Sequence, residues 1–109
     1  ICERASTNTG ENVAMAMPLI DREIGLKSIR SLIAVGKISS SRRFLMTLKR
    51  HWREPKRMLL PVNYFRVDAD RWWEDDAFRM RVMREWNKIP SYIERGFLTE
   101  LDESDGLIA

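Results

Sequence analysis

Cysteine and histidine are almost absent from this sequence: Cys2 and His51 are the only residues of their kinds among 109. A lone cysteine excludes an intramolecular disulfide and a zinc site built on cysteines. Long apolar runs are also missing, because the longest, residues 13–20, is interrupted by Pro18 and falls far short of the roughly 20 residues that span a bilayer. We therefore expect no membrane span, and a location in a reducing intracellular compartment, cytoplasm or nucleus, rather than secretion.

The patterns that catalysis and cofactor binding require are missing as well. The five glycines are too dispersed for a phosphate-binding loop, and no serine sits in a Gly-x-Ser-x-Gly turn. The carboxylate clusters at 74–76 and 102–105 lack the alternating ligands and the glycine of a helix-loop-helix calcium site. The sequence therefore predicts a non-enzymatic protein with no catalytic residues, no cofactor and no metal site.

Charge is abundant, and it is sorted along the chain. The net charge is only +3, but residues 37–67 contain nine basic side chains and one acidic one. Residues 68–109 contain eleven acidic side chains and six basic ones. Such a separation favours binding to a charged partner over catalysis. The partner of the basic segment is either a polyanion or the acidic part of this chain or of another copy.

The length predicts one domain, since two halves would each be too small to build a core unaided. Residues 3–12 are small and polar without a period, and an acidic stretch closes the chain. We therefore expect a flexible N-terminal tail over residues 1–17, a helical domain over residues 18–98 and an acidic C-terminal tail over residues 99–109.

Helical periodicity predicts a mainly α fold, a small single-domain bundle of about four helices with one extended connector. The expected helices cover residues 26–36, which end at a glycine, residues 41–53, a long stretch from Asp68 or Asp70 to Lys88, and a short one from Pro90 to Gly96. The connector covers residues 58–67. Because Pro61 cannot donate a hydrogen bond, we expect that segment to be an edge strand or a packed loop rather than a central strand.

A basic helix is the strongest functional signal. On a helical wheel the apolar side chains of residues 44–52 share one arc and the cations share another. The predicted contacts to nucleic acid within residues 42–57 are Arg42, Arg43, Lys49, Arg50, Arg53, Lys56 and Arg57. An exposed face that is almost all positive suits contact with the phosphate backbone better than readout of bases. The alternatives are that this face docks on an acidic protein surface or is simply solvated.

Tryptophans are concentrated in the segment that follows the basic region. Trp72, Trp73 and Trp86 are predicted interface residues, because tryptophan is enriched where proteins meet. Stacking against bases and burial in the core of the bundle are the other interpretations of the same residues.

Two functional hypotheses follow from these features. The first is a non-enzymatic helical module whose basic helix, residues 42–57, contacts RNA or DNA backbone without strong sequence readout. The alternative is a protein-interaction or self-assembly module, such as a viral structural or accessory protein or a subunit of a larger complex. In that case the basic middle pairs with the acidic C-terminal third of a partner or of a second copy, giving a homo-oligomer.

Overall fold

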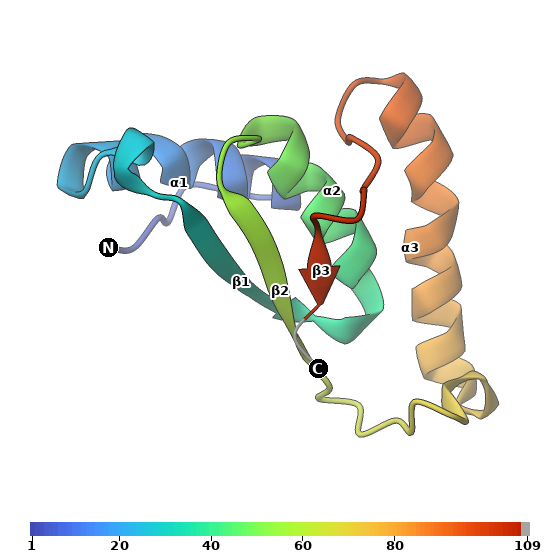
Figure 1. The fold of residues 1–109 in the computed structure, drawn as a ribbon. Helices are drawn as coiled ribbons and strands as arrows, with labels where there is room; N and C mark the ends of the chain where they lie inside the picture. Colours follow the sequence, from blue (N-terminus) through green and yellow to red (C-terminus); the bar gives the residue numbers. More distant parts are fainter. Residues whose placement is uncertain (108–109) are drawn as a thin grey trace.

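A small parallel sheet organises the chain (Figure 1), and the computed structural model describes residues 1–107. In chain order the elements are α1 (Thr9–Glu23), η1 (Leu26–Ser28), β1 (Ser31–Lys37), η2 (Ile38–Ser40), α2 (Ser41–His51), β2 (Lys56–Val62), η3 (Trp72–Glu74), α3 (Asp76–Glu94) and β3 (Gly106–Leu107), where η marks a 3₁₀ helix. The strands are parallel in the order β1-β2-β3. Because parallel neighbours need a crossover, α2 links β1 to β2, and α3 lies between β2 and β3.

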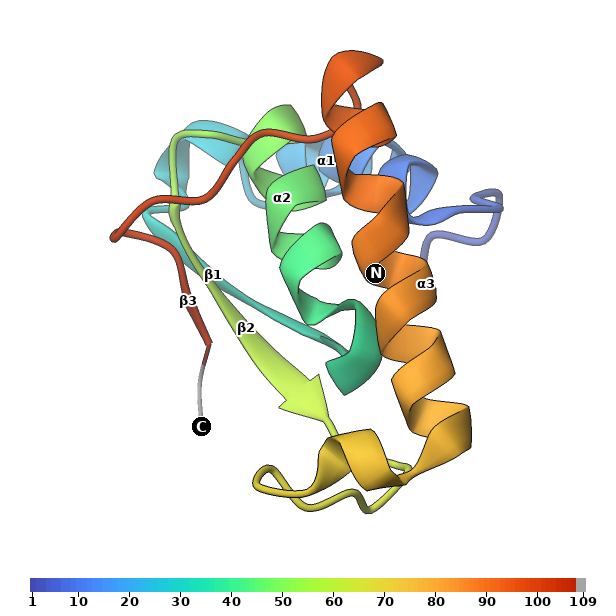
Figure 2. The same cartoon turned by 90° about the vertical axis from the view of Figure 1, so that its right-hand side faces the viewer.

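All three α-helices lie on one side of the sheet (Figures 1 and 2). α2 lies directly against the strands and α3 packs along α2 and η2 in an outer layer. The main apolar core forms between the sheet and the helices, where fully buried Leu59 of β2 meets Val13 of α1 and Leu45 and Leu48 of α2. A second cluster joins Met46 of α2 to α3 and the segment that follows it.

The predicted four-helix bundle is wrong. The fold is mixed α/β, with three α-helices and a parallel sheet whose two long strands, β1 and β2, are joined by the short β3. The decisive misassignment is the expected helix over residues 26–36, most of which is strand β1. Its companion strand β2 occupies the first part of the expected connector.

The misassignment of β1 has a physical cause. Both faces of this strand are apolar, so Leu32, Ile33 and Val35 imitate a helical stripe, whereas their burial alternates residue by residue as in a strand. Gly36, the expected helix terminator, lies inside β1. Gly25 follows α1 with φ of +89°, a left-handed conformation that favours glycine after a helix.

The expected connector over residues 58–67 also needs correction, because its strand is central in the sheet. β2 pairs with β1 along seven residues and with β3 at Met58 and Leu59. The N–H of Lys56 bonds to Arg30 on the β1 side, so alternation turns the nitrogen of Pro61 toward the β3 side. The described β3 pairs stop at Leu59, so Pro61 interrupts no ladder bond there.

The later helices are closer to expectation. The helix predicted over residues 41–53 is present as α2. The two helices expected before and after Pro90 are one continuous helix, α3, with Pro90 inside it. α3 begins at Asp76, where the Asp75 carboxylate accepts a hydrogen bond from the Phe78 N–H, and it ends before Gly96, which has φ of +78°.

Both expected tails contribute to the folded unit. Residues 9–17 belong to α1, which Asn8 caps by accepting a hydrogen bond from the Glu11 N–H, and Val13 is buried in the core. In the segment after residue 98, Leu101 packs on both clusters and β3 joins the sheet. Among residues 1–107 no helix is long and apolar enough to cross a membrane.

Truncating the core residue of β2 tests this layering. We expect Leu59→Ala to lower the free energy of unfolding by about 3 kcal/mol, because Leu59 is fully buried between the sheet and α2. Leu60→Ala, one residue along on the opposite face, is the control and should cost less than about 1 kcal/mol. Urea denaturation measures both. Equal losses would contradict the one-sided core.

Candidate functional site

Helix α2 is central rather than exposed, which changes the setting of the predicted basic surface. Its residues 45–49 are all buried, because the strands lie on one side of the helix and α1, α3 and the C-terminal segment lie around it. The apolar arc faces the core as expected. Over much of the length of α2, the cationic arc faces residues 68–107, the acidic part of the same chain.

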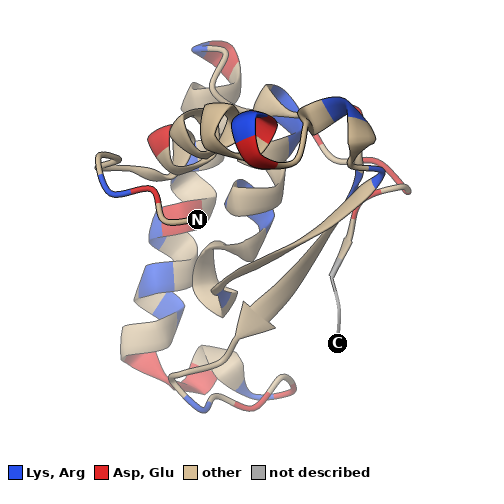
Figure 3. Ribbon diagram, turned by 90° about the vertical axis from the view of Figure 1, so that its left-hand side faces the viewer, with Lys and Arg blue, Asp and Glu red and all other residues tan. Residues whose placement is uncertain are grey.

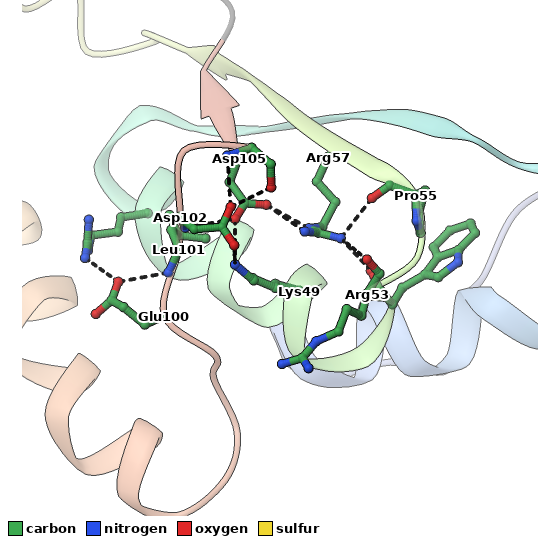
Figure 4. Close-up of polar contacts among 11 residues, drawn as sticks. Lys49, Arg53, Pro55, Arg57, Glu100, Leu101, Asp102 and Asp105 are labelled. Atoms are coloured by element: carbon green, nitrogen blue, oxygen red, sulfur yellow. Dashed lines mark hydrogen bonds and ion pairs between the residues drawn. The ribbon is translucent and has the colours of Figure 1, made fainter.

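Lys49 is the clearest case (Figure 4). Its side chain is 8% exposed, and its Nζ donates to Asp102 Oδ2 at 2.7 Å and to Asp105 Oδ2 at 2.9 Å. Asp105 is fully buried just before β3, and Asp102 lies at the rim. A buried ammonium therefore holds two carboxylates from a segment more than 50 residues away in the sequence.

Arg57, at the start of β2, completes this cluster from the other side (Figure 4). Its side chain is 5% exposed and donates to Asp105 Oδ1 at 2.9 Å. Its Nη1 donates to the carbonyl oxygens of Trp52, Arg53 and Pro55 at 3.3, 2.6 and 2.8 Å. These carbonyls lie at and beyond the C-terminus of α2, where no further helical turn provides donors. Arg57 is therefore a structural residue that ties the end of α2 to the C-terminal segment.

The pKa values within the cluster shift as such pairing requires. Burial raises the pKa of Asp105, but hydrogen bonds from Lys49, from the Asp102 N–H and from Arg57 outweigh it and leave the pKa below its ordinary value. The hydrogen bond from Lys49, with two from Ser104, lowers the pKa of Asp102. Hydrogen bonds to Asp102 and Asp105 raise the pKa of Lys49. Lys49, Asp102 and Asp105 are therefore charged at neutral pH.

Three further cations of the predicted surface also contact α3 or the segment after it. Arg42 bonds to Glu100 and lies over the ring of Trp86, Arg43 pairs with Glu85, and Arg50 donates to the Gly96 carbonyl at 2.7 Å. Arg53 and Lys56 are exposed, and their side chains make no ion pair within the described residues. Contact between this surface and nucleic acid stays a prediction. In this conformation Arg53 and Lys56 are the members of the predicted surface whose side chains are exposed and make no described contact with α3 or the segment after it.

The outer face of the sheet is the first surface that the sequence analysis missed. Among the described residues no helix covers it (Figures 1 and 2), and it carries Ile33 and Val35 of β1 with Leu60 and Val62 of β2, 39–61% exposed. Met58, the register partner of Ile33, lies between them. Figure 3 shows both strands uncharged between basic residues near their ends. The sequence signal for this strand was the short apolar run over residues 32–35 with its β-branched Ile33 and Val35, because such a run fits a buried strand as well as a helix.

The second surface that the sequence did not reveal lies on one side of α3. Met80, Met83, Trp86 and Ile93 recur at spacings of three and seven residues, so they share one side of the helix, and they are 39–60% exposed. Of the predicted interface residues, Trp86 lies in this stripe and Trp73 is 48% exposed beside the start of α3. Trp72 is half-buried against Phe78, with ring centroids 6.1 Å apart. Their role as an interface stays a prediction.

A hollow and the placement of possible metal ligands complete the description of the helix layer. A hollow of about 690 Å³ lies where the start of α1 meets α2 and α3, and His51 is one of its lining residues. Within residues 1–107 no three His, Cys, Asp or Glu side chains are grouped to hold a metal ion. The two apolar surfaces therefore remain the main candidate site.

Comparison with known proteins identified no matching protein family, curated protein or solved structure. The functional argument therefore starts from the geometry of this chain.

The buried ion cluster predicts an acid-sensitive fold. The pKa of Asp105 is lowered by folding, so this carboxylate stabilises the fold above its ordinary pKa near 4 and loses that effect as the pH falls through the lowered value. We expect Asp105→Asn to lower the unfolding free energy at pH 7 by about 3 kcal/mol, because it leaves Lys49 and Arg57 short of a buried partner. It should also reduce the loss of stability between pH 7 and pH 3.

Glu103→Gln is the matched control, since Glu103 is an exposed carboxylate in the same segment. Urea denaturation across the pH range measures all three proteins. Identical pH profiles for Asp105→Asn and the parent would contradict the role of the cluster.

Proposed function

We propose that this chain is a self-association module, in which the outer face of the sheet in one copy receives the apolar side of α3 from the next. The observation that supports this most strongly is the parallel sheet with one uncovered apolar face. Parallel sheets are almost always covered on both faces, usually by helices. A contiguous apolar patch of this kind on a protein surface is typical of an interaction site.

The chain itself carries a surface of the matching kind. The stripe of Met80, Met83, Trp86 and Ile93 runs along a 19-residue helix, about 28 Å long, while the strands of the sheet are about 23 Å long. A helix of this length can cover the whole face of β1 and β2. Its flexible methionines and a tryptophan suit packing on branched aliphatic side chains.

Charge at the ends of the two surfaces supports the same pairing. Lys37 ends β1 and Lys56 begins β2, so the apolar sheet face has a cation at each end. Asp76 and Glu94, the first and last residues of α3, lie on the striped side of the helix. Asp76 is 82% exposed although it bonds to Arg79, and Glu94 makes no ion pair within the described residues.

The geometry also predicts the form of the assembly. The two surfaces differ, so the contact is head-to-tail and each copy keeps one surface open for a further copy. One helix against two strands buries less than the roughly 800 Å² per partner of a standard interface, so the association is weak and reversible. We therefore expect open chains that grow with concentration.

Sedimentation velocity with two complementary variants tests this proposal. The mass of the parent should rise beyond that of a dimer between roughly 10 µM and 1 mM, the range expected for a small interface. Val35→Glu places a charge on the sheet face and Met83→Glu places one on the helix stripe. Each variant alone should be a 12.9 kDa monomer, and an equal mixture should form dimers and nothing larger, because one intact surface of each kind remains.

Ile24→Glu is the matched control for Val35→Glu, because both parent side chains are 61% exposed and Ile24 lies outside both surfaces. Met15→Glu, on α1, is the control for Met83→Glu, and thermal unfolding checks that all variants are folded. Both controls should assemble as the parent does. A parent that stays monomeric at every concentration contradicts self-association, and a Met83→Glu variant that assembles normally contradicts the role of α3.

A further inference from the structure

A cationic pocket lies at the C-terminal end of β1, away from the buried ion cluster. Its volume is about 420 Å³, and it is enclosed by the turn between β1 and α2, the start of α1 and the middle of α3. Its polar lining includes Lys37, Ser39, Ser40, Arg43, Arg81 and Arg84. Of these residues, only Arg43 belongs to the basic surface predicted from the sequence. Arg81 and Arg84 lie more than 40 residues after Lys37 and the serines, so the two groups meet only in the fold.

The charge in this pocket is unbalanced. Lys37, Arg81 and Arg84 make no ion pair within the described residues. The one carboxylate in the lining, Glu85, is held by Arg43 and by Lys88, whose Nζ is 3.1 Å from it. The guanidinium of Arg81 also lies 5.1 Å from the ring centroid of Phe65, a contact that leaves its charge uncompensated. The pocket therefore presents three cations whose charge nothing in the described structure neutralises.

The backbone at the pocket adds to this positive field. The turn from β1 passes through η2 directly into α2, and no acidic residue lies in the first turn of either helix. No side chain of the described residues caps the start of α2. The pocket thus combines arginine side chains with serine residues at the positive end of a helix. It lies beyond the carboxyl end of a parallel strand, where open α/β sheets usually hold their ligands.

We infer that this pocket binds a phosphate group. A phosphate has the oxygen geometry to accept paired hydrogen bonds from Arg81 and Arg84 and single ones from Lys37 and the serine hydroxyls. The pocket volume suits the phosphate of a mononucleotide or one phosphate of a nucleic-acid backbone, and these two sources share the same chemistry. The inference does not depend on self-association, because the pocket is formed within one copy of the chain.

Titration followed by amide NMR tests the inference with three probes: inorganic phosphate, adenosine 5′-monophosphate and a short oligothymidylate. Binding in the pocket should shift the amide signals of Ser39 and Ser40. We expect Arg81→Gln combined with Arg84→Gln to weaken binding at least tenfold. The control combines Arg79→Gln with Arg95→Gln, which removes the same charge from α3 and the residue after it but outside this pocket, and should change affinity by less than about twofold.

The three probes also distinguish the sources. Binding of phosphate and the mononucleotide that depends on Arg81 and Arg84 supports a small phosphorylated ligand, and equally selective binding of the oligothymidylate supports a nucleic-acid backbone in the same pocket. An equal loss in the two double variants would show diffuse attraction and overturn the inference. Unchanged Ser39 and Ser40 signals with all three probes would overturn it as well.

Discussion

The contact on which much of this structure depends is the buried cluster in which Lys49 and Arg57 share the carboxylate of Asp105. Asp105 comes directly before β3, so this contact fixes the third strand against β2 and holds the segment after α3 over α2. Two buried cations and one buried carboxylate are stable only together, because any member left alone would lack compensation for its lost hydration. Every buried side-chain nitrogen and oxygen among the described residues has a hydrogen-bond partner, so the cluster meets that condition.

The cluster also explains the charge pattern of the sequence. The excess of basic residues over 37–67 and of acidic residues over 68–109 is in part an internal pairing, in which the acidic third covers the basic helix of the same chain. That interpretation was one of the alternatives open from the sequence. Three cations that make no ion pair within the described residues, Lys37, Arg81 and Arg84, surround a pocket at the β1–α2 turn and α3, and no continuous stretch of sequence displays this surface.

How far the sequence predicts the fold depends on the element. α2 was predictable because one arc of it is apolar and the other cationic, and the long helix was predictable in outline, although Pro90 does not divide it. β1 was not, because a strand with two apolar faces shows no alternation of polarity and Leu32, Ile33 and Val35 also fit a helix. Because β1 was not predicted, the uncovered face of the sheet was not predicted either. The seven predicted cations lie on α2, just after it or at the start of β2. Whether such a helix is open or covered depends on contacts across more than 40 residues, which local pattern does not encode.

The titration of Asp105 tests the central claim, that this carboxylate binds the basic helix α2 and holds the C-terminal segment over it. The signal of its carboxyl carbon, followed by NMR in the folded protein as the pH is lowered, reports its protonation directly. The account predicts a midpoint below the ordinary aspartate pKa near 3.9, with the Lys49 and Arg57 side-chain signals changing in the same transition. A midpoint at the ordinary value, with no response from Lys49 or Arg57, would show that the C-terminal segment is not bound to α2 and would contradict the account.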